Sequence, residues 1–426
     1  MFKFSYENRT LSAGSPWHLF CLSNLYFAQG LPNGFLFFAL NTYYASQGAT
    51  VAELAKFSSL LLLPWIFKGL FAPLIDSFTI RKFGRRRFWV LSSQIVTIIL
   101  LLLLTLLGNE LSISSMGLVV MTVNFSIAFL DLSTDALAAD SLDEIALSKA
   151  NGLMWGSKVV GNAVGMFLGT TLFFTYGIST GVAVLVVIMM IIFLVPLNSR
   201  ELDFKVGYES SSFKKNFLPP LDLLKEIVKV FDDSRARWAI VFILFINLGL
   251  GVFEPVYNKF FLEELKWTGE MIGNVRTWSL LAGGVTGLLI GLLGTYYQRH
   301  LLLFLFISIQ ITVYGLLGLY VDQITNSYAH LIIFALDMTG AAISVSMFAI
   351  FMSLCTSQSS ATNFGIFMAL LNLSNYTGNQ IAPGLMEAYS FSGSFLFCSL
   401  ALIPAALLTF KLASTNQSRL ARNPFK

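Results

Sequence analysis

The sequence predicts an all-α integral membrane protein with about twelve transmembrane helices in two six-helix bundles. Of its 426 residues, 56% are hydrophobic and only 12% are charged, and the mean hydropathy is +0.73. Soluble domains carry about 25% charged residues, so this composition indicates lipid as the solvent. A spanning helix needs about 20 mostly apolar residues, and such stretches recur along the whole chain.

One long polar stretch, 198–236, separates six apolar stretches from six more. The expected spans are 17–46, 51–76, 87–107, 114–139, 150–176, 178–197, 237–261, 271–296, 301–321, 328–354, 362–390 and 392–412. This pattern predicts an N-terminal bundle over 1–197 and a C-terminal bundle and tail over 237–426. Apolar residues at helical spacing in 198–236 predict an amphipathic helix in a cytoplasmic linker.

Basic residues gather on one side of the expected membrane. With the N-terminus inside, 21 of the 27 Lys and Arg residues fall in the termini and the cytoplasmic connections. The positive-inside rule therefore predicts that both termini are cytoplasmic. Four basic residues lie outside this set (Lys56, Lys259, Lys266 and Arg276), and Lys68 and Lys158 lie within spans.

Opposite charges fall at one depth in the N-terminal half. Lys68, Asp131 and Lys158 each lie eight residues from the cytoplasmic end of a span, about 12 Å into the membrane. Asp135 follows Asp131 by one helical turn. Intramembrane ionisable groups mark ion and solute pathways, so we expect a cavity in which Asp131 or Asp135 carries a proton and the lysines contact solute. Ion pairs that only lock the bundle are the alternative.

Fewer charges lie in the C-terminal half. Glu254 lies toward the outer end of the seventh span and Asp337 near the middle of the tenth. The eleventh span carries Asn372, Asn375 and Asn379 on one helix face. Each of these residues either lines the solute cavity or satisfies a partner on a neighbouring helix.

Glycines shape several spans. Gly161, Gly165 and Gly169 repeat every fourth residue in the fifth span, and Gly283, Gly287 and Gly291 do so in the eighth. Such faces allow close helix packing, either between the two bundles or within one. In the first span Gln29, Gly30, Pro32, Asn33 and Gly34 cluster within about two turns, which predicts a kinked gating helix in which Gln29 and Asn33 line the cavity.

A basic loop joins the second and third spans. Asp76 closes the second span, and Arg85, Arg86 and Arg87 precede the third. A carboxylate facing these arginines would form a charge-assisted cytoplasmic gate. Alternatively, the arginines only determine topology.

Other function classes lack sequence support. The three histidines, His18, His300 and His330, form no metal set with acidic residues, and no GxxxxGK[ST] motif is present. We therefore expect no catalytic residues, no metal, no cofactor and no nucleic-acid partner. A membrane sensor would need a signalling domain, and 198–236 is too short for one.

Six segments resemble one family. They are LYFAQGLPNG (25–34), LPWIFKGLFAPLIDSF (63–78), FGRRRFWVL (83–91), DLSTD (131–135), NGLMWGSKVVGNAVG (151–165) and SSATNFGIFMALLN (359–372). They resemble the AmpG-like branch of the major facilitator superfamily, the peptide/acetyl-coenzyme A/drug transporter family of muropeptide and siderophore permeases.

This resemblance implies the major facilitator fold and a monomeric, proton-driven carrier in the bacterial inner membrane, with lipids, protons and a small-molecule solute as partners. Asp131 and Asp135 match the branch's two acidic positions in the fourth span, and Lys68 matches its basic position in the second. Lys158 stands where the branch has an arginine. We expect import of a bulky polar solute, with anhydro-muropeptides first and a siderophore or acetyl-coenzyme A as the alternative.

Overall fold

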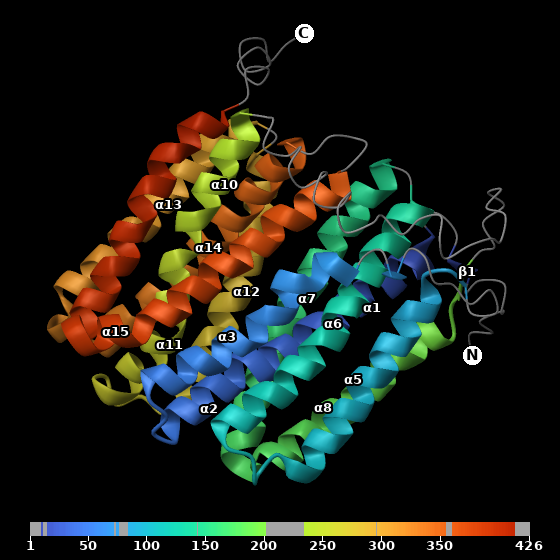
Figure 1. The fold of residues 1–426 in the computed structure, drawn as a ribbon, viewed down its shortest axis with the longest axis horizontal. Helices are drawn as coiled ribbons and strands as arrows, with labels where there is room; N and C mark the ends of the chain where they lie inside the picture. The colour runs from blue at the N-terminus through green and yellow to red at the C-terminus, as the bar shows by residue number, and fades with distance from the viewer. Residues whose placement is uncertain are drawn as a thin grey trace. The chain divides into compact units, whose positions relative to one another are not determined.

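The chain divides into two compact units in its computed structural model (Figure 1). The structure describes residues 10–11, 15–71, 74–75, 84–142, 144–201, 234–294, 296–354 and 360–413. Within these residues the secondary structure is helical except for a parallel pairing of two short strands. The predicted amphipathic helix of the linker lies outside the described residues.

The first unit comprises Met1–Leu40 and Phe67–Pro219. Its helices are α1 (Pro16–Asn33), η2 (Gly34–Ala39), η3 (Lys68–Phe71), α5 (Arg87–Leu107), α6 (Ile113–Ser141), α7 (Glu144–Tyr176) and α8 (Ile178–Leu197). Its two strands are β1 (Thr10–Leu11) and β2 (Arg200–Glu201). The predicted limits of the third and sixth spans coincide with α5 and α8.

The second unit comprises Asn41–Ile66 and Pro220–Lys426. It contains α2 (Leu40–Ser46) and α3 (Val51–Phe67), except that the first residue of α2 and the last residue of α3 belong to the first unit. The others are α10 (Ser234–Ile246), α11 (Leu248–Glu263), α12 (Gly269–Leu293), α13 (Arg299–Leu319), η6 (Val321–Gln323), α14 (Asn326–Leu354), α15 (Ser360–Leu408) and η7 (Thr409–Leu412). The predicted domains, in contrast, keep 41–66 with the N-terminal half, and their limits stay a prediction.

The membrane class is confirmed. Among the described residues, ten helices are long and apolar enough to cross a membrane. The last of these, α15, consists of two helices joined at Ser390, where φ is 55°. The sequence predicts a break between two spans at the same place, after residue 390. A further helical run, Pro16–Ser46, covers the predicted first span.

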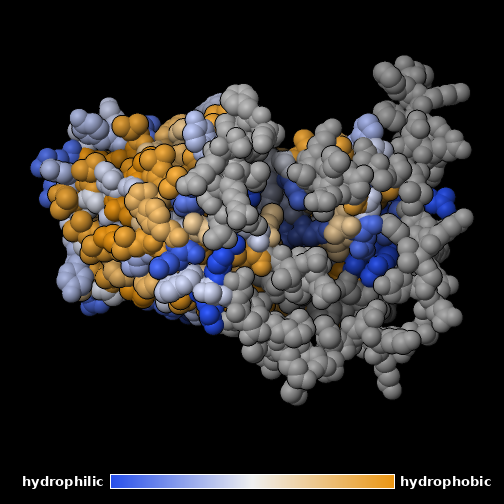
Figure 2. Space-filling model, turned by 90° about the horizontal axis from the view of Figure 1, so that it is seen from above, coloured by the Kyte–Doolittle hydropathy of each residue, from blue (hydrophilic) through white to orange (hydrophobic). Residues whose placement is uncertain are grey.

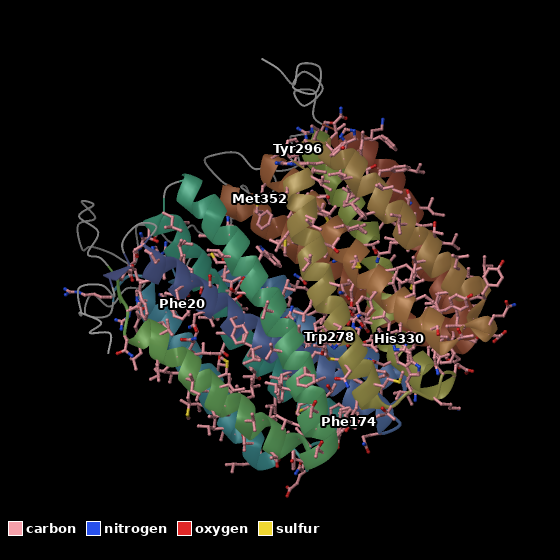
Figure 3. All side chains as sticks on the ribbon, turned by 180° about the vertical axis from the view of Figure 1, so that it is seen from behind. Phe20, Phe174, Trp278, Tyr296, His330 and Met352 are labelled. Atoms are coloured by element: carbon pink, nitrogen blue, oxygen red, sulfur yellow. The ribbon has the colours of Figure 1, made fainter. Side chains whose placement is uncertain are left out.

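Apolar side chains face outward as well as inward. Figure 2 shows hydrophobic residues, in orange, over much of the face that it presents. Phe20, Trp278 and Met352, labelled in Figure 3, are 52%, 65% and 51% exposed. Burying such side chains in lipid is favourable, so this outer surface suits a membrane protein.

The first span changes its hydrogen bonding in the middle. α1 contains Pro32, which lacks a backbone N–H, and the helix becomes a π-helix at Gly34. Single π-helical turns within α-helices occur frequently at functional sites. The structure thus has an irregular first span where the sequence predicts a kink, while its gating role stays a prediction.

Both glycine ladders pack within their own units. Gly161, Gly165 and Gly169 face the first span, and a Cβ on Gly161 would lie 2.8 Å from the Phe27 carbonyl oxygen. Gly283 faces α14 in the same manner, with 2.9 Å from its Cβ position to the Asp337 carbonyl oxygen. The glycine ladders therefore pack helices within each unit, which is one of the two arrangements that the sequence allows.

Gly161→Ala is expected to lower the stability of the protein by about 1–3 kcal/mol, because its methyl group would force the backbones of α1 and α7 apart. Gly156 is the matched control on the same helix, since a Cβ there meets nothing within 4 Å. The thermal midpoint of the purified full-length protein should fall for Gly161→Ala and hold or rise for Gly156→Ala. Equal midpoints would contradict the packing described here.

Candidate functional site

Asp131 is the centre of a charge cluster in the first unit. Its Oδ2 lies 2.7 Å from Lys68 Nζ, and its Oδ1 lies 3.5 Å from Lys158 Nζ. Asp131 is buried on α6, Lys68 begins the 3₁₀ turn η3, and Lys158 lies on α7. The structure thus brings together the three charges that the sequence places at one depth. Two cations beside one buried carboxylate favour its ionised form.

Asp135 has different surroundings. Its side chain is exposed, and it accepts a hydrogen bond from the hydroxyl of Tyr26 on α1. Within the described residues Asp135 forms no ion pair, although it lies one turn from Asp131. The two aspartates, which the sequence does not distinguish, are therefore chemically unequal.

Lys158 is held by polar and aromatic neighbours from α1 and α7. Its Nζ lies 3.4 Å from Gln29 Oε1, and it stands over the rings of Tyr26 (5.6 Å) and Trp155 (5.4 Å). Cations over aromatic faces are stabilised by the ring quadrupole. Asn33 donates from Nδ2 to Asn162 Oδ1 at 3.1 Å, so both predicted first-span polar residues contact α7.

This contact between α1 and α7 depends on glycines. A Cβ on Gly30 or Gly34 would overlap the carbonyl groups of Lys158 or Asn162. Without Cβ atoms the two backbones approach closely, which brings Gln29 within reach of Lys158. The FAQGLPNG cluster therefore positions a charge of the site in addition to making the span irregular.

A second buried cluster lies in the second unit around Arg276 of α12. Arg276 Nη1 lies 2.9 Å from Asp337 Oδ1, and its Nη2 lies 4.0 Å from Glu254 Oε1. The guanidinium stands 5.1 Å above the Tyr257 ring. From the sequence, Arg276 is only one of the basic residues outside the cytoplasmic set. The sequence does not predict this cluster, because a charge near the end of a predicted span is typical of the membrane boundary.

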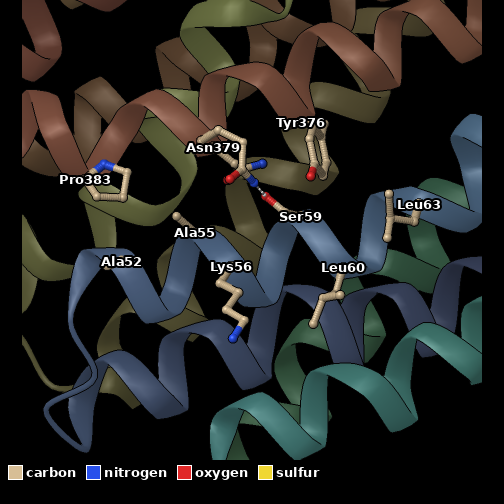
Figure 4. Close-up of a pocket in the computed structure, with 10 residues that line it drawn as sticks. Ala52, Ala55, Lys56, Ser59, Leu60, Leu63, Tyr376, Asn379 and Pro383 are labelled. Atoms are coloured by element: carbon tan, nitrogen blue, oxygen red, sulfur yellow. Dashed lines mark hydrogen bonds between the residues drawn. The ribbon is translucent and has the colours of Figure 1, made fainter.

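The amide face of α15 borders a cavity of about 380 Å³ shared with α3 (Figure 4). Asn379 lines this cavity, and Gln380 Nε2 donates to Ser59 Oγ at 2.7 Å across it. Asn375 accepts hydrogen bonds from Asn379, while Asn372 donates to the Met368 carbonyl at 2.8 Å. Of the three predicted amides, the structure places only Asn379 at this cavity.

The arginines of the basic loop have described partners other than Asp76, which lies outside the described residues. Arg86 Nε pairs with Asp140 Oδ2 at 2.7 Å, and Arg85 lies 3.4 Å from the same oxygen. Arg87 donates to the Pro196 and Leu197 carbonyls at the end of α8. These contacts join α5, α6 and α8 within the first unit, and the cytoplasmic gate stays a prediction.

Glu201 of β2 closes the same region. Its carboxylate accepts the backbone N–H groups of Arg86 and Arg87 at 3.0 and 2.9 Å, where α5 begins. A carboxylate at a helix N-terminus is favourable. Burial nevertheless raises the pKa of Glu201, and the two N–H donors oppose that rise. Neither Asp140 nor Glu201 carries a sequence signal that selects it from other acidic residues.

Within the described part of the chain, no three His, Cys, Asp or Glu side chains lie together in a way that could hold a metal ion. The chemistry of the described clusters is therefore that of carboxyl, ammonium, guanidinium and amide groups.

The family assignment follows from a match over most of the chain. The model of the BT1 family matches residues 28–412. The chain belongs to the BT1 family. The matched range includes both charge clusters and the amide face of α15.

Two relatives support this assignment over nearly full lengths. A putative transporter of Rickettsia felis named AmpG 4 is 22% identical to this chain over 420 residues. The alignment covers 93% of this chain and 96% of the Rickettsia protein. The anhydromuropeptide permease of Escherichia coli K12 is 22% identical over 400 residues, covering 90% and 77%. The sequence resemblance to the AmpG-like branch is confirmed.

Solved structures show the fold. The crystal structure of the nucleoside transporter NupG aligns with this chain with a TM-score of 0.69 at 14% identity. The alignment covers 92% of this chain and 98% of NupG. A bacterial homologue of the human lysosomal transporter Spinster, inward-facing and unoccupied, gives 0.68 at 12% identity, over 93% and 97%. The fold is that of major facilitator transporters, and the protein is a multi-pass membrane transporter rather than an enzyme.

Proposed function

We propose that the protein is a proton-coupled secondary transporter that imports a bulky polar solute across the inner membrane, with anhydro-muropeptides as the first candidate. The observation that carries this proposal is the unequal pairing of two neighbouring aspartates. Asp131 lies between Lys68 and Lys158, whereas Asp135 has only the Tyr26 hydroxyl. In this proposal both termini are cytoplasmic and the protein acts as a monomer.

Asp135 is the coupling proton site in this proposal. A carboxyl group beside an ionised carboxylate is easier to protonate, because two neighbouring negative charges repel each other. Asp131 supplies that negative charge one turn away. Asp135 is exposed whereas Asp131 is buried, so in this proposal Asp135 is the aspartate that exchanges protons with water. Tyr26 holds the carboxyl group in place in either protonation state, because its hydroxyl can donate or accept.

Proton binding then favours an anionic solute. With both aspartates ionised, their charges cancel those of Lys68 and Lys158. Protonating Asp135 leaves the cluster with one excess positive charge, so a solute carboxylate binds more tightly. By linkage, the bound solute strengthens proton binding by the same factor, which is the requirement for symport.

The solute class rests on two supports. The Escherichia coli relative is named an anhydromuropeptide permease, and polar groups of Gln29, Asn33 and Asn379 suit a sugar- and amide-rich solute. A siderophore or acetyl-coenzyme A is the second candidate, because two lysines in one cluster suit any anionic ligand. In this proposal Glu254 and Asp337, which do not line the cavity between α3 and α15, belong to the solute pathway through the second unit.

Uptake into proteoliposomes tests the solute class. Purified protein is given an inward pH gradient and, separately, labelled anhydro-muropeptide, a ferric siderophore or acetyl-coenzyme A. A gradient of about one pH unit stores about 1.4 kcal/mol per proton, enough for about tenfold accumulation at one proton per solute. We expect this accumulation for anhydro-muropeptide, abolished by a protonophore. Accumulation of another compound alone would replace the solute class, and protonophore-resistant accumulation would contradict proton coupling.

A further inference from the structure

Asp337 receives a hydrogen bond at each of its two carboxylate oxygens. Arg276 Nη1 donates to its Oδ1 at 2.9 Å, and the Ser279 hydroxyl donates to its Oδ2. Both carboxylate oxygens therefore have a donor, and one of them is cationic. Charge-assisted bonds of this kind are strong, so Asp337 is ionised and paired.

Glu254 has no comparable partner. Its nearest cation atom is Arg276 Nη2 at 4.0 Å, beyond hydrogen-bond distance, and it accepts no hydrogen bond from any described residue. Its side chain is only 11% exposed and lies on a membrane-spanning helix. Ionising a buried carboxyl group without donors costs several kcal/mol. The cheaper state at this position is the neutral acid.

The other groups around Glu254 do not change this balance. Tyr257 on its own helix and Tyr314 on α13 are neutral phenols at neutral pH, and Tyr257 has a hydrogen bond with Thr42. The Cys398 thiol of α15 donates to the Gly249 carbonyl at 3.2 Å. α10 carries its charged residues, Arg235 and Arg237, only in its first turn. Arg276 is therefore the single described cation beside two acids.

We propose that Glu254 is a second proton-binding site, located in the second unit and separate from Asp135, and that Arg276 controls its occupancy. While Arg276 pairs with Asp337 alone, Glu254 keeps its proton. When Arg276 Nη2 closes its 4.0 Å gap to Glu254 and Nη1 stays on Asp337, the carboxyl group of Glu254 releases its proton to water. The resulting carboxylate then shares the guanidinium with Asp337, so each buried carboxylate faces one nitrogen of Arg276.

Infrared spectroscopy of the purified full-length protein tests this site without any transport assay. A buried neutral carboxyl group gives a C=O stretching band that ionisation removes. We expect such a band at neutral pH, shifted by carboxyl-¹³C glutamate labelling and lost in Glu254→Gln. Glu263→Gln is the matched control on α11, since Glu263 is 48% exposed and pairs with Lys259 at 2.5 Å, and it should leave the band unchanged.

Asp337→Asn separates proton binding from a structural role. Without the Asp337 charge, Glu254 is the remaining acid beside Arg276 and ionises to pair with it, so the glutamic acid band should disappear although Glu254 is still present. Persistence of the band in either Asp337→Asn or Glu254→Gln, or its absence in the wild type, would overturn the proposal. A band that shifts only with labelled aspartate would assign the proton to an aspartate such as Asp135, which leaves the proposed function intact and removes this second site.

Discussion

Asp135→Asn is expected to abolish accumulation of anhydro-muropeptide driven by a pH gradient while solute exchange across the membrane continues. Asparagine keeps the size of the side chain and its contact with the Tyr26 hydroxyl, but it cannot bind and release a proton. The gradient then has no site through which to act. At one proton per solute, accumulation should fall from about tenfold at one pH unit to none.

Two measurements separate this loss from misfolding. Exchange of labelled for unlabelled solute at equal concentrations needs no gradient, and it should continue in Asp135→Asn vesicles. Asp322→Asn is the control for replacing an acidic residue, since Asp322 is exposed in η6. Full gradient-driven accumulation by Asp135→Asn would exclude Asp135 as the coupling site and direct attention to Asp131.

Lys68→Met should destabilise the protein by about 3–5 kcal/mol, the cost of removing one partner from a buried ion pair. Lys68 forms the 2.7 Å contact with Asp131, so its loss leaves an excess negative charge in the cluster. The midpoint of denaturant-induced unfolding of the purified protein measures this effect. Lys259→Met is the comparison, because it breaks a pair with the half-exposed Glu263, and such pairs contribute about 0–1 kcal/mol.

Charge balance predicts a rescue. The double variant Lys68→Met with Asp131→Asn removes one positive and one negative charge together, so it should recover part of the stability that Lys68→Met loses. Additive losses would show that Lys68 stabilises the fold through packing of its aliphatic chain rather than through the ion pair.

The sequence predicts the helices and the first cluster well for physical reasons. Long apolar stretches determine the spans, and equal depth on three helices brings Lys68, Asp131 and Lys158 together. Depth follows directly from residue counting, because a helix rises a fixed distance per residue.

Partners that depend on rotation about a helix axis are harder to predict. Tyr26 is one of fourteen tyrosines, and no spacing indicates that its hydroxyl meets Asp135. The glycine ladder of α7 predicts a close approach without selecting α1 as the partner. Similarly, Arg276 lies two turns into α12, because that helix begins at Gly269. The predicted span begins at residue 271, which places Arg276 closer to the membrane boundary than the structure does.

We expect solute and proton to move together through the same protein. Proteoliposomes in a lightly buffered medium, given anhydro-muropeptide but no pH gradient, test it most directly with an external pH electrode. The account predicts alkalinisation of the medium as solute enters with protons, and none in Asp135→Asn vesicles. Solute entry without any pH change in wild-type vesicles would contradict it.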